Sequence, residues 1–346
     1  MDLSNLMVTE EITVLETMEK INKNGYGIAF VCENKKLLAV ITDGDIRRHI
    51  LKNGNLNDPI QLISNYNPLS IFQDDPTDYT AFMISHHITA IPIVNRLQEI
   101  VSIECLYKDT IKQLINLDTP VVIMAGGKGS RLSPYTDILP KPLIPIGDKT
   151  ITEHIMDRFE TFGCTHFDII VNYKKNLIRS YFLDNEQKRD IDFIDEPAFM
   201  GTGGGLKLLT GKYKKPFFMS NCDIIIEGDY SAILAYHNNQ QNIITIISAM
   251  KNVTIPYGTI QIDDNGQVLH LKEKPSFSFM TNTGLYIIDP TFLEKIPADT
   301  FIHITEVIQN CIDQGEKVGV YPISEDSWMD MGQIGELEKM RQRLEL

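Results

Sequence analysis

The sequence predicts an α/β protein in two parts, in which a mixed sheet flanked by helices follows a smaller α+β domain. Three observations predict this arrangement. The chain has 346 residues, more than one domain usually holds. A diverged internal repeat fills its first third. From Val121 onward, apolar strand patterns alternate with helical patterns, as they do in parallel sheets that carry helices on both faces.

The repeat has two copies, GIAFVCENKKLLAVITDGDIRRHIL (27–51) and AIPIVNRLQEIVSIECLYKDTIKQLI (90–115). Each copy has the pattern of a β-branched strand, a polar turn, a second apolar strand and an amphipathic helix. Another helical pattern precedes each copy, at Val14–Lys23 and Tyr79–His87. Because two such units can bury their open sheet faces against each other, we expect one small domain over residues 1–117.

The second part begins after Leu117-Asp118-Thr119-Pro120, which we interpret as the join. Three strand–helix pairs follow: PVVIMA with ITEHIMDRFETFG, FDIIV with KNLIRSYFL, and PFFMSN with YSAILAYHNN. The turn Asp264-Asn265-Gly266 between GTIQI and VLHLKEKP predicts a hairpin, so this part gains antiparallel strands. We therefore expect a Rossmann-like domain with a β insertion over residues 120–346.

The net charge of −14 argues against a general binder of nucleic acids or anionic membranes, because phosphate-rich partners demand a basic surface. Both parts are acidic, with 10 Lys/Arg against 16 Asp/Glu in residues 1–119 and 22 against 30 in the remainder. A site for phosphates must therefore use a few placed cations, backbone amides and metal.

The five cysteines are scattered and include no CxxC pair, so the sequence predicts neither a zinc site nor a disulfide framework. The first residues lack the basic-then-apolar pattern of a signal peptide, and no apolar run reaches the length of a membrane span. We expect a cytoplasmic enzyme.

The strongest local signal is VVIMAGGKGSRLSPYTDILPKPLIPI (121–146), where an apolar strand runs into a glycine-rich turn. Glycines let backbone amides approach phosphate oxygens, and the cations nearby supply charge. The pattern is neither GxGxxG with a downstream acid nor GxxxxGK[ST], which excludes the dinucleotide and P-loop motifs. A tight turn with a surface arginine is the alternative. The strand, the three glycines, Arg131 and Pro140-Lys141-Pro142 together favour a phosphate site.

This stretch resembles the signature of sugar-1-phosphate nucleotidyltransferases, (L/M)-A-G-G-x-G-x-R-L-x-P-x-T followed by P-K-P, and matches every specified position. The resemblance implies an Mg²⁺-dependent reaction of an NTP with a sugar 1-phosphate that releases pyrophosphate. It also implies nucleotide-binding residues in this turn and in the later GTGGG motif: Ala125, Gly126, Gly127, Gly129, Ser130, Arg131, Gly201, Thr202 and Gly203. Arg131, Lys141 and Asp223 are the implied catalytic residues.

Two later motifs carry the implied metal ligands, Asp223 and Asp330. The segment Phe218–Asp223 has the pattern of a buried strand that ends in Asp, and open α/β sheets bind ligands at such ends. Cys222 stands where the family commonly has glycine in N-G-D. Trp328–Gly332 resembles the family's W-x-D-x-G. As alternatives, Asp at a strand end is often a helix N-cap, and the tryptophan could fill the core.

The remaining motifs lie on the implied sugar-phosphate side. They are E-K-P at 273–275, N-x-G-x-Y at 282–286 and the end of GTGGG, and three consecutive glycines weaken a helix for no evident structural gain. The implied residues are Asn172, Gly204, Glu273, Lys274 and Asn282. A charged β-edge before proline, turn chemistry at a strand start and a glycine-rich helix start are the alternatives.

The repeat resembles a pair of CBS modules over residues 1–117. In that family a Thr or Ser followed three residues later by Asp often grips the ribose and phosphate of an adenosine nucleotide, and Thr42 and Asp45 match. The second copy has Glu104 and Tyr107 at the equivalent places. The alternative is that Thr42 caps the next helix, with Asp45 in its first turn. The resemblance implies an adenine nucleotide as ligand and a homodimer.

The order of a CBS pair and a compact transferase resembles enzymes that make GDP-glucosamine for nonulosonic (legionaminic) acid synthesis. It favours GTP and glucosamine 1-phosphate, while guanylyl, thymidylyl or other transfer to mannose, heptose or glucose 1-phosphate stays open. A non-catalytic sensor of nucleotides and NDP-sugars is the alternative of another class. Such a sensor should have lost Arg131, Lys141, Asp223 or Asp330, and all four are present.

Overall fold

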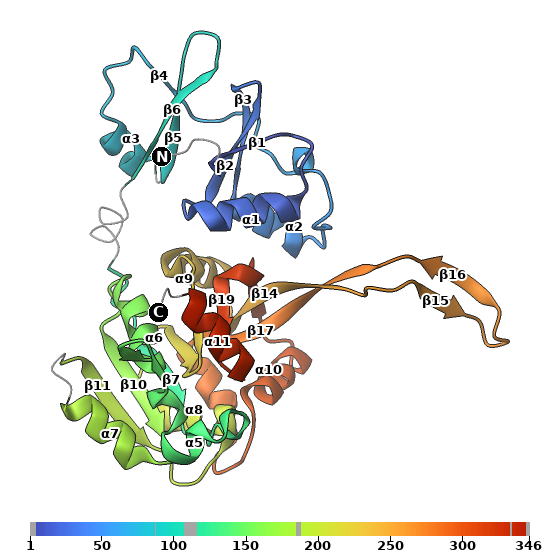
Figure 1. Ribbon diagram of the computed structural model, residues 1–346. Helices are drawn as coiled ribbons and strands as arrows, with labels where there is room; N and C mark the ends of the chain where they lie inside the picture. Colours follow the sequence, from blue (N-terminus) through green and yellow to red (C-terminus); the bar gives the residue numbers. More distant parts are fainter. Residues whose placement is uncertain (1–4, 87, 107–115, 185–187, 333, 344–346) are drawn as a thin grey trace. The chain divides into compact units, whose positions relative to one another are not determined.

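The computed structural model describes residues 5–86, 88–106, 116–184, 188–332 and 334–343 (Figure 1). The chain divides into two compact units. The first unit comprises Met1–Leu106, Ala249–Thr281 and Pro322–Asp326, and the second comprises Tyr107–Ser248, Asn282–Tyr321 and Ser327–Leu346.

The first unit holds two three-stranded sheets, one for each copy of the repeat. They are β1 (Met7–Val8), β2 (Ile28–Glu33) and β3 (Lys36–Thr42), and β4 (Ile71–Phe72), β5 (Ala90–Val94) and β6 (Ile100–Cys105). In each sheet a short strand pairs in parallel with the first strand of an antiparallel hairpin. Both copies therefore have the strand–turn–strand pattern expected from the sequence.

Helices α1 (Val14–Asn24), α2 (Asp43–Leu51) and α3 (Tyr79–Ser85) belong to the same unit. The predicted helix that ends the second copy, up to Ile115, lies outside the described residues. Apolar side chains of α1, α2, β2 and β3 form one core, and Met250 from the later part of the chain belongs to it.

The second unit is built on a seven-stranded sheet in the order β11-β10-β7-β12-β17-β14-β18. The strands are β7 (Val121–Ala125), β10 (His166–Val171), β11 (Asp190–Asp195), β12 (Phe217–Asn221), β14 (Ile244–Thr254), β17 (Ser276–Ile288) and β18 (Val318–Ser324). The first four in this order run parallel, and β17 is antiparallel to β12. The near-continuous apolar sequences of β7, β10 and β12 suit strands that are buried on both faces.

The helices of the second unit are α5 (Tyr135–Ile138), α6 (Ile151–Glu160), α7 (Lys175–Asp184), α8 (Gly201–Leu206), α9 (Tyr230–Gln240), α10 (Ile304–Asp313) and α11 (Ile334–Arg343). Short pairs β8 (Pro145–Ile146) with β9 (Lys149–Thr150) and β13 (Ile224–Ile226) with β19 (Trp328–Asp330) complete it. All three predicted strand–helix pairs are present, so the expected mixed α/β fold is confirmed. None of the described helices is both long and apolar enough to cross a membrane.

The predicted hairpin is formed by β15 (Thr259–Ile262) and β16 (Val268–Lys272), drawn in Figure 1 as a two-stranded ribbon. In its turn, the Asp263 side chain accepts hydrogen bonds from the backbone of Asn265 and Gln267. Gly266 has a positive φ of 79°, which a side chain would disfavour.

Candidate active site

A cavity of about 300 Å³ lies in the second unit, at the carboxyl ends of the parallel strands. The parallel strands β7, β10, β11 and β12 all end at the same edge of the sheet. The segments that follow them begin at Gly126, Asn172, Glu196 and Cys222. Its lining consists of Met124, Gly126, Gly127, Lys128, Gly129, Ser130, Arg131, Lys141, Glu196, Phe199, Gly201, Thr202, Asn221, Cys222, Asp223 and Gly332.

The glycine-rich turn lines this cavity without interruption from Gly126 to Arg131. A Cβ on Gly126 would lie 2.6 Å from Oε2 of Glu196, so a side chain there would displace this carboxylate. Gly129 has a φ of +67° and begins a short 3-10 turn over Ser130–Leu132. A Cβ on Gly129 would lie 3.1 Å from Cβ of Lys141. The glycines therefore bring the turn close to the side chains that follow it.

Three cations face the cavity with different surroundings. Lys128 and Arg131 are exposed, and no ion pair to either forms within the described part of the chain. Lys141 is largely buried and forms an ion pair with Asp223, whose side chain is also largely buried. The free cations can take phosphate oxygens directly, whereas Lys141 is held against a carboxylate.

Asp223 and Asp330 meet through the antiparallel pair β13–β19, in which Ile224 is opposite Asp330. The backbone N–H of Met331 donates to the carbonyl of Asp223 at 2.9 Å. Burial, and next the Asp223 carboxylate, raise the pKa of Asp330. The Gly332 N–H donates to Asp330 at 2.7 Å and, with Lys141 and Arg131, acts in the opposite direction. Two close carboxylates beside a cavity that is lined by three cations suit Mg²⁺, which prefers such oxygen ligands.

Glu196 is a buried carboxyl group on the cavity wall, with 3% of its surface exposed. Its Oε1 accepts from the backbone N–H of Met200 at 2.8 Å, while Asn172 donates to the Glu196 carbonyl at 2.9 Å. Across the described residues, Oε2 accepts no hydrogen bond, and it lies next to Gly126. Burial raises the pKa of Glu196, and the Met200 N–H partly opposes this.

The GTGGG motif forms α8 and packs against the backbone of residues 300–303. Cβ atoms on Gly201 and Gly204 would lie 2.6 Å from the carbonyl oxygens of Ile302 and Thr300, respectively. The N–H groups of Gly203 and Gly204 donate to Ile302 at 3.0 and 3.1 Å. The view that these glycines bring no structural gain is therefore wrong, because they permit this close backbone packing. Gly201 and Thr202 line the cavity, but Gly203 and Gly204 are not among its lining residues.

Several other predicted residues stand behind the cavity rather than on its surface. Ala125 is buried at the end of β7. The Asn172 side chain donates a hydrogen bond to the Glu196 carbonyl and so holds the loop that begins at Glu196. Asn282 donates to the Tyr286 hydroxyl at 2.6 Å and accepts from the Gly284 N–H at 3.0 Å. Gly284 packs against the side chain of Asn221, which does line the cavity. The N-x-G-x-Y motif therefore adjoins the end of β12, two residues before Asp223.

Four predicted residues belong to the first unit: Glu273 and Lys274, which follow β16, and Thr42 and Asp45. None of the four is among the residues that line the cavity of the second unit. Thr42 caps α2 in a capping box, where its hydroxyl donates to Asp45 at 2.5 Å and the Asp45 N–H donates back at 3.3 Å. Asp45 also pairs with Arg48. The capping arrangement that the sequence offered as the alternative is thus present.

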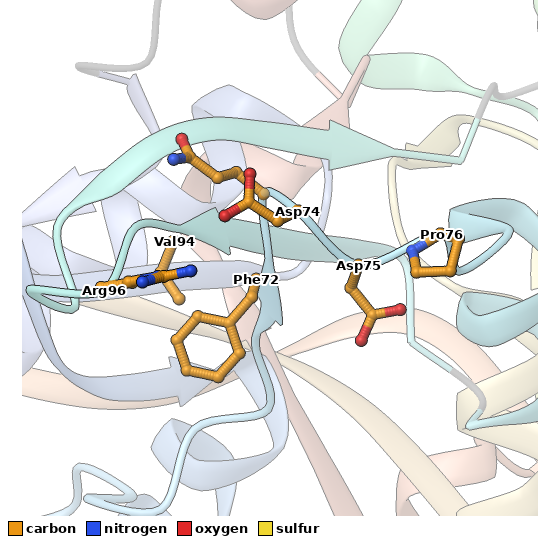
Figure 2. A pocket seen from close by; sticks show the side chains of 7 residues that line it. Phe72, Asp74, Asp75, Pro76, Val94 and Arg96 are labelled. Carbon is orange, nitrogen blue, oxygen red and sulfur yellow. The ribbon is translucent and has the colours of Figure 1, made fainter.

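The first unit has a separate pocket of about 360 Å³ at the end of β4 and β5, shown in Figure 2. Its lining residues are Phe72, Gln73, Asp74, Asp75, Pro76, Val94 and Arg96. The Asp75 carboxylate accepts from the backbone and hydroxyl of Thr77, as in an ordinary polar turn. This pocket does not include Thr42 or Asp45.

Comparison with known proteins identifies the class. Residues 120–345 match the family model for nucleotidyl transferases, and residues 1–52 match the CBS domain model. The chain therefore belongs to the nucleotidyl transferase family and carries CBS sequence at its N-terminus.

Curated relatives differ in their printed activities. A UTP–glucose-1-phosphate uridylyltransferase of Synechocystis is 29% identical over 62% of this chain and 60% of the relative. A bifunctional protein GlmU of Methanococcus maripaludis is 31% identical, over 61% and 51%. The mannose-1-phosphate guanylyltransferase catalytic subunit beta of Drosophila melanogaster is 29% identical, over 62% and 60%. The chain thus spans about half to three-fifths of the length of these relatives.

Solved structures resemble the fold. The crystal structure of HddC from Yersinia pseudotuberculosis is 24% identical, with a TM-score of 0.52, and covers 65% of this chain and 99% of that one. A second structure of HddC, complexed with GMP-PN, has the same score and coverage.

Phe199 and Asn221 line the cavity but were not predicted as site residues. An aromatic inside the loop between Glu196 and Gly201 was the available signal for Phe199.

Proposed function

We propose that this protein is a sugar-1-phosphate guanylyltransferase that converts GTP and glucosamine 1-phosphate into GDP-glucosamine and pyrophosphate. The observation that carries the reaction class is one cavity that joins the glycine-rich turn, three cations and Asp223 at the carboxyl edge of the sheet. Membership of the nucleotidyl transferase family supports it.

In this reaction a phosphate oxygen of the sugar phosphate attacks the α-phosphorus of the NTP, and pyrophosphate leaves. Both reactants are anions, so catalysis needs positioning and charge neutralisation and no protein nucleophile. The turn from Gly126 to Arg131 binds the triphosphate, with Lys128 and Arg131 pairing its oxygens. Lys141, oriented by Asp223, neutralises charge at the reacting phosphates. Asp223 and Asp330 would hold Mg²⁺, which supplies further neutralisation when bound.

Glu196 supports the choice of guanine. Oε2 of Glu196 accepts no hydrogen bond from the described residues, and Glu196 lines the cavity, so this oxygen can accept from N–H donors of a ligand. Guanine offers adjacent N1–H and N2–H₂ donors on one edge, whereas the equivalent edge of uracil or thymine offers one N–H between two carbonyls. Carbonyl oxygens would be repelled by the carboxylate. Glu196 therefore favours GTP over UTP and dTTP.

We expect Glu196→Gln to lower kcat/KM for GTP by about 10- to 100-fold, because hydrogen bonds to a charged group contribute about 1.5–3 kcal/mol. An amide presents one donor and one acceptor, so the relative use of UTP and dTTP should rise. Pyrophosphate release with each NTP measures this, with the exposed Glu294→Gln as the matched control. An unchanged preference for GTP in Glu196→Gln would refute the assignment of Glu196 to the base.

The acceptor is tested by pyrophosphate release with Mg²⁺ across four NTPs and a panel of sugar 1-phosphates. Glucosamine 1-phosphate is favoured by the resemblance of the CBS-plus-transferase order, and mannose, heptose and glucose 1-phosphates are the competing acceptors. Release with another pair would correct the specificity and keep the class. No release with any pair would favour the non-catalytic sensor. We further propose that the protein is cytoplasmic, which is compatible with its five free cysteines. The resemblance to CBS modules supports a homodimer.

A further inference from the structure

Two exposed phenylalanine rings stand together at the nucleotide cavity. Phe199 lines the cavity with 51% of its surface exposed, and Phe301 is 55% exposed. Their ring centroids are 5.7 Å apart and tilted by 55°, and the Phe301 ring meets His303 edge-on at 5.0 Å. Phe199 and Phe301 are 102 residues apart in the sequence, so this pair, here called the aromatic shelf, arises only from the fold.

The backbone beside each ring is fixed. Next to Phe199, the Met200 carbonyl accepts from the Ile302 N–H at 2.9 Å, and its N–H donates to buried Glu196. Next to Phe301, the Ile302 carbonyl accepts from two glycines of α8. Because each of these bonds involves Met200 or Ile302, the residues that directly follow the two phenylalanines, the shelf is held in place before any ligand arrives.

The two phenylalanine rings are about half exposed, so part of their apolar surface remains in contact with water. A flat ligand that covers this surface gains the favourable free energy of apolar burial. Phe199 is three residues from Glu196, whose free oxygen suits the edge of a base, and both line the same cavity. A ring face beside a hydrogen-bonding edge is the combination that binds a nucleobase. The sugar motif at Asn282 instead adjoins Asn221 through Gly284.

We propose that Phe199 stacks on the purine base of the nucleotide and that Phe301 is a positioning residue that supports the Phe199 ring. The inference rests on the proposed function, since it assumes that an NTP occupies this cavity. Phe199 is then a binding residue that contributes affinity for the base and none for the phosphates.

The test compares GTP with inorganic tripolyphosphate, which shares the phosphates and lacks the base. Dissociation constants are measured by calorimetry on the full chain with Mg²⁺. Phe199→Ala should weaken GTP binding by about tenfold, in the range for loss of one base–aromatic stack, and leave tripolyphosphate binding unchanged. Phe199→Tyr should bind GTP like the wild type. Phe301→Ala should cause a smaller loss, because its ring does not line the cavity.

Phe72→Ala is the matched control, because Phe72 is 47% exposed and lies in the other unit. Phe199→Leu is a second variant, which keeps apolar bulk without an aromatic face and should also lose GTP affinity. Equal GTP affinity in Phe199→Ala and the wild type would overturn the stacking role alone. Parallel loss of tripolyphosphate affinity would overturn it in favour of a loop defect. A wild type that binds no NTP would overturn the proposed function as well.

Discussion

Asp330 lies beside Asp223, which lines the cavity, and burial together with the Asp223 charge raises the pKa of Asp330. We expect Asp223→Asn and Asp330→Asn each to lower kcat by more than about 100-fold, since each removes one of two proposed Mg²⁺ ligands. The assay is Mg²⁺-dependent pyrophosphate release. The exposed Asp148→Asn, in the same unit, should keep wild-type activity.

The melting temperature separates this effect from unfolding. Asp330→Asn removes a negative charge from a close pair, so it should not melt below the wild type for electrostatic reasons. Asp223→Asn also breaks the largely buried ion pair with Lys141, so this variant should melt below the wild type. A folded Asp330→Asn protein with substantial Mg²⁺-dependent turnover would rule out Asp330 as a metal ligand. The same result for Asp223→Asn would require another role for its ion pair with Lys141.

His237 makes the stability of the second unit pH-dependent. It is 2% exposed, its Nδ1 lies 2.9 Å from Thr245 Oγ1, and burial lowers its pKa to about 4. The unfolded chain binds a proton near its ordinary pKa of 6.5, so stability present above pH 6.5 is lost as pH falls toward 4. Between pH 7 and pH 5 the loss is about 2 kcal/mol.

Urea unfolding at both pH values measures this loss. His237→Gln cannot take the proton, so its free energy of unfolding should change less between pH 7 and pH 5 by that amount. The exposed His270→Gln should retain the full wild-type dependence. A His237→Gln protein with the same pH dependence as the wild type would contradict a buried neutral imidazole.

Individual residues show what the sequence could predict of the site. The motif residues from Gly126 to Arg131, with Lys141 and Asp223, do line one cavity. Each motif is a local pattern, and the carboxyl ends of parallel strands share one edge of the sheet. The free oxygen of Glu196 could not be predicted, since it depends on how Met200 and Gly126 pack around the carboxyl group. The role of Asn172 as a brace for the Glu196 loop likewise depends on a contact across 24 residues.

Among the elements, helix α8 depends on its glycines for packing. We expect Gly201→Ala to destabilise the protein by several kcal/mol, because a Cβ would lie 2.6 Å from the Ile302 carbonyl oxygen. Gly211→Ala is the matched control. Its φ of +81° is close to the +77° of Gly201, but nothing lies within 4 Å of its Cβ.

The control should therefore lose only about 1–2 kcal/mol, the cost of placing a side chain in the left-handed region. Urea unfolding of both variants gives the difference, which isolates the steric contact with Ile302 from backbone strain. Equal destabilisation of Gly201→Ala and Gly211→Ala would show that α8 can move away from residues 300–303.

Strands and helices with strong local patterns were predictable, as β7, β10 and β12 show with their buried apolar runs. The short pair β13–β19 was not. It joins residues 224–226 to 328–330, about a hundred positions apart, and only this pairing brings Asp330 to Asp223. The meeting of α8 with residues 300–303 is a contact of the same kind, which no local pattern reveals.

For the whole molecule, the division into units adds a contact that the linear order hides. Residues 249–281, which interrupt the second unit, belong to the compact unit that contains the repeat. Met250 packs in the same core as Val14 and Ile41. From the sequence we expected this segment in the second part, because its neighbours in the chain belong there. Its place in the first unit depends on tertiary packing, which the order of residues does not reveal.

The repeat unit also permits a test of ligand binding in the full chain. If the first unit binds an adenine nucleotide through Thr42 and Asp45, AMP at a hundred times its dissociation constant should raise the free energy of unfolding by about 2.7 kcal/mol. The melting temperature should rise accordingly. Asp45→Asn should abolish this shift, whereas Asp223→Asn, in the catalytic cavity, should keep it. Differential scanning fluorimetry with AMP, ADP and ATP measures all three proteins.

The capping box gives the competing expectation. Thr42 and Asp45 already hydrogen-bond each other, so their role can be completed by holding the start of α2. In that case Thr42→Ala should lower stability by about 1 kcal/mol with no nucleotide present, and no adenine nucleotide should shift the wild type. A shift that survives in Asp45→Asn but disappears in Asp223→Asn would assign the nucleotide to the catalytic cavity and leave the repeat a purely structural unit.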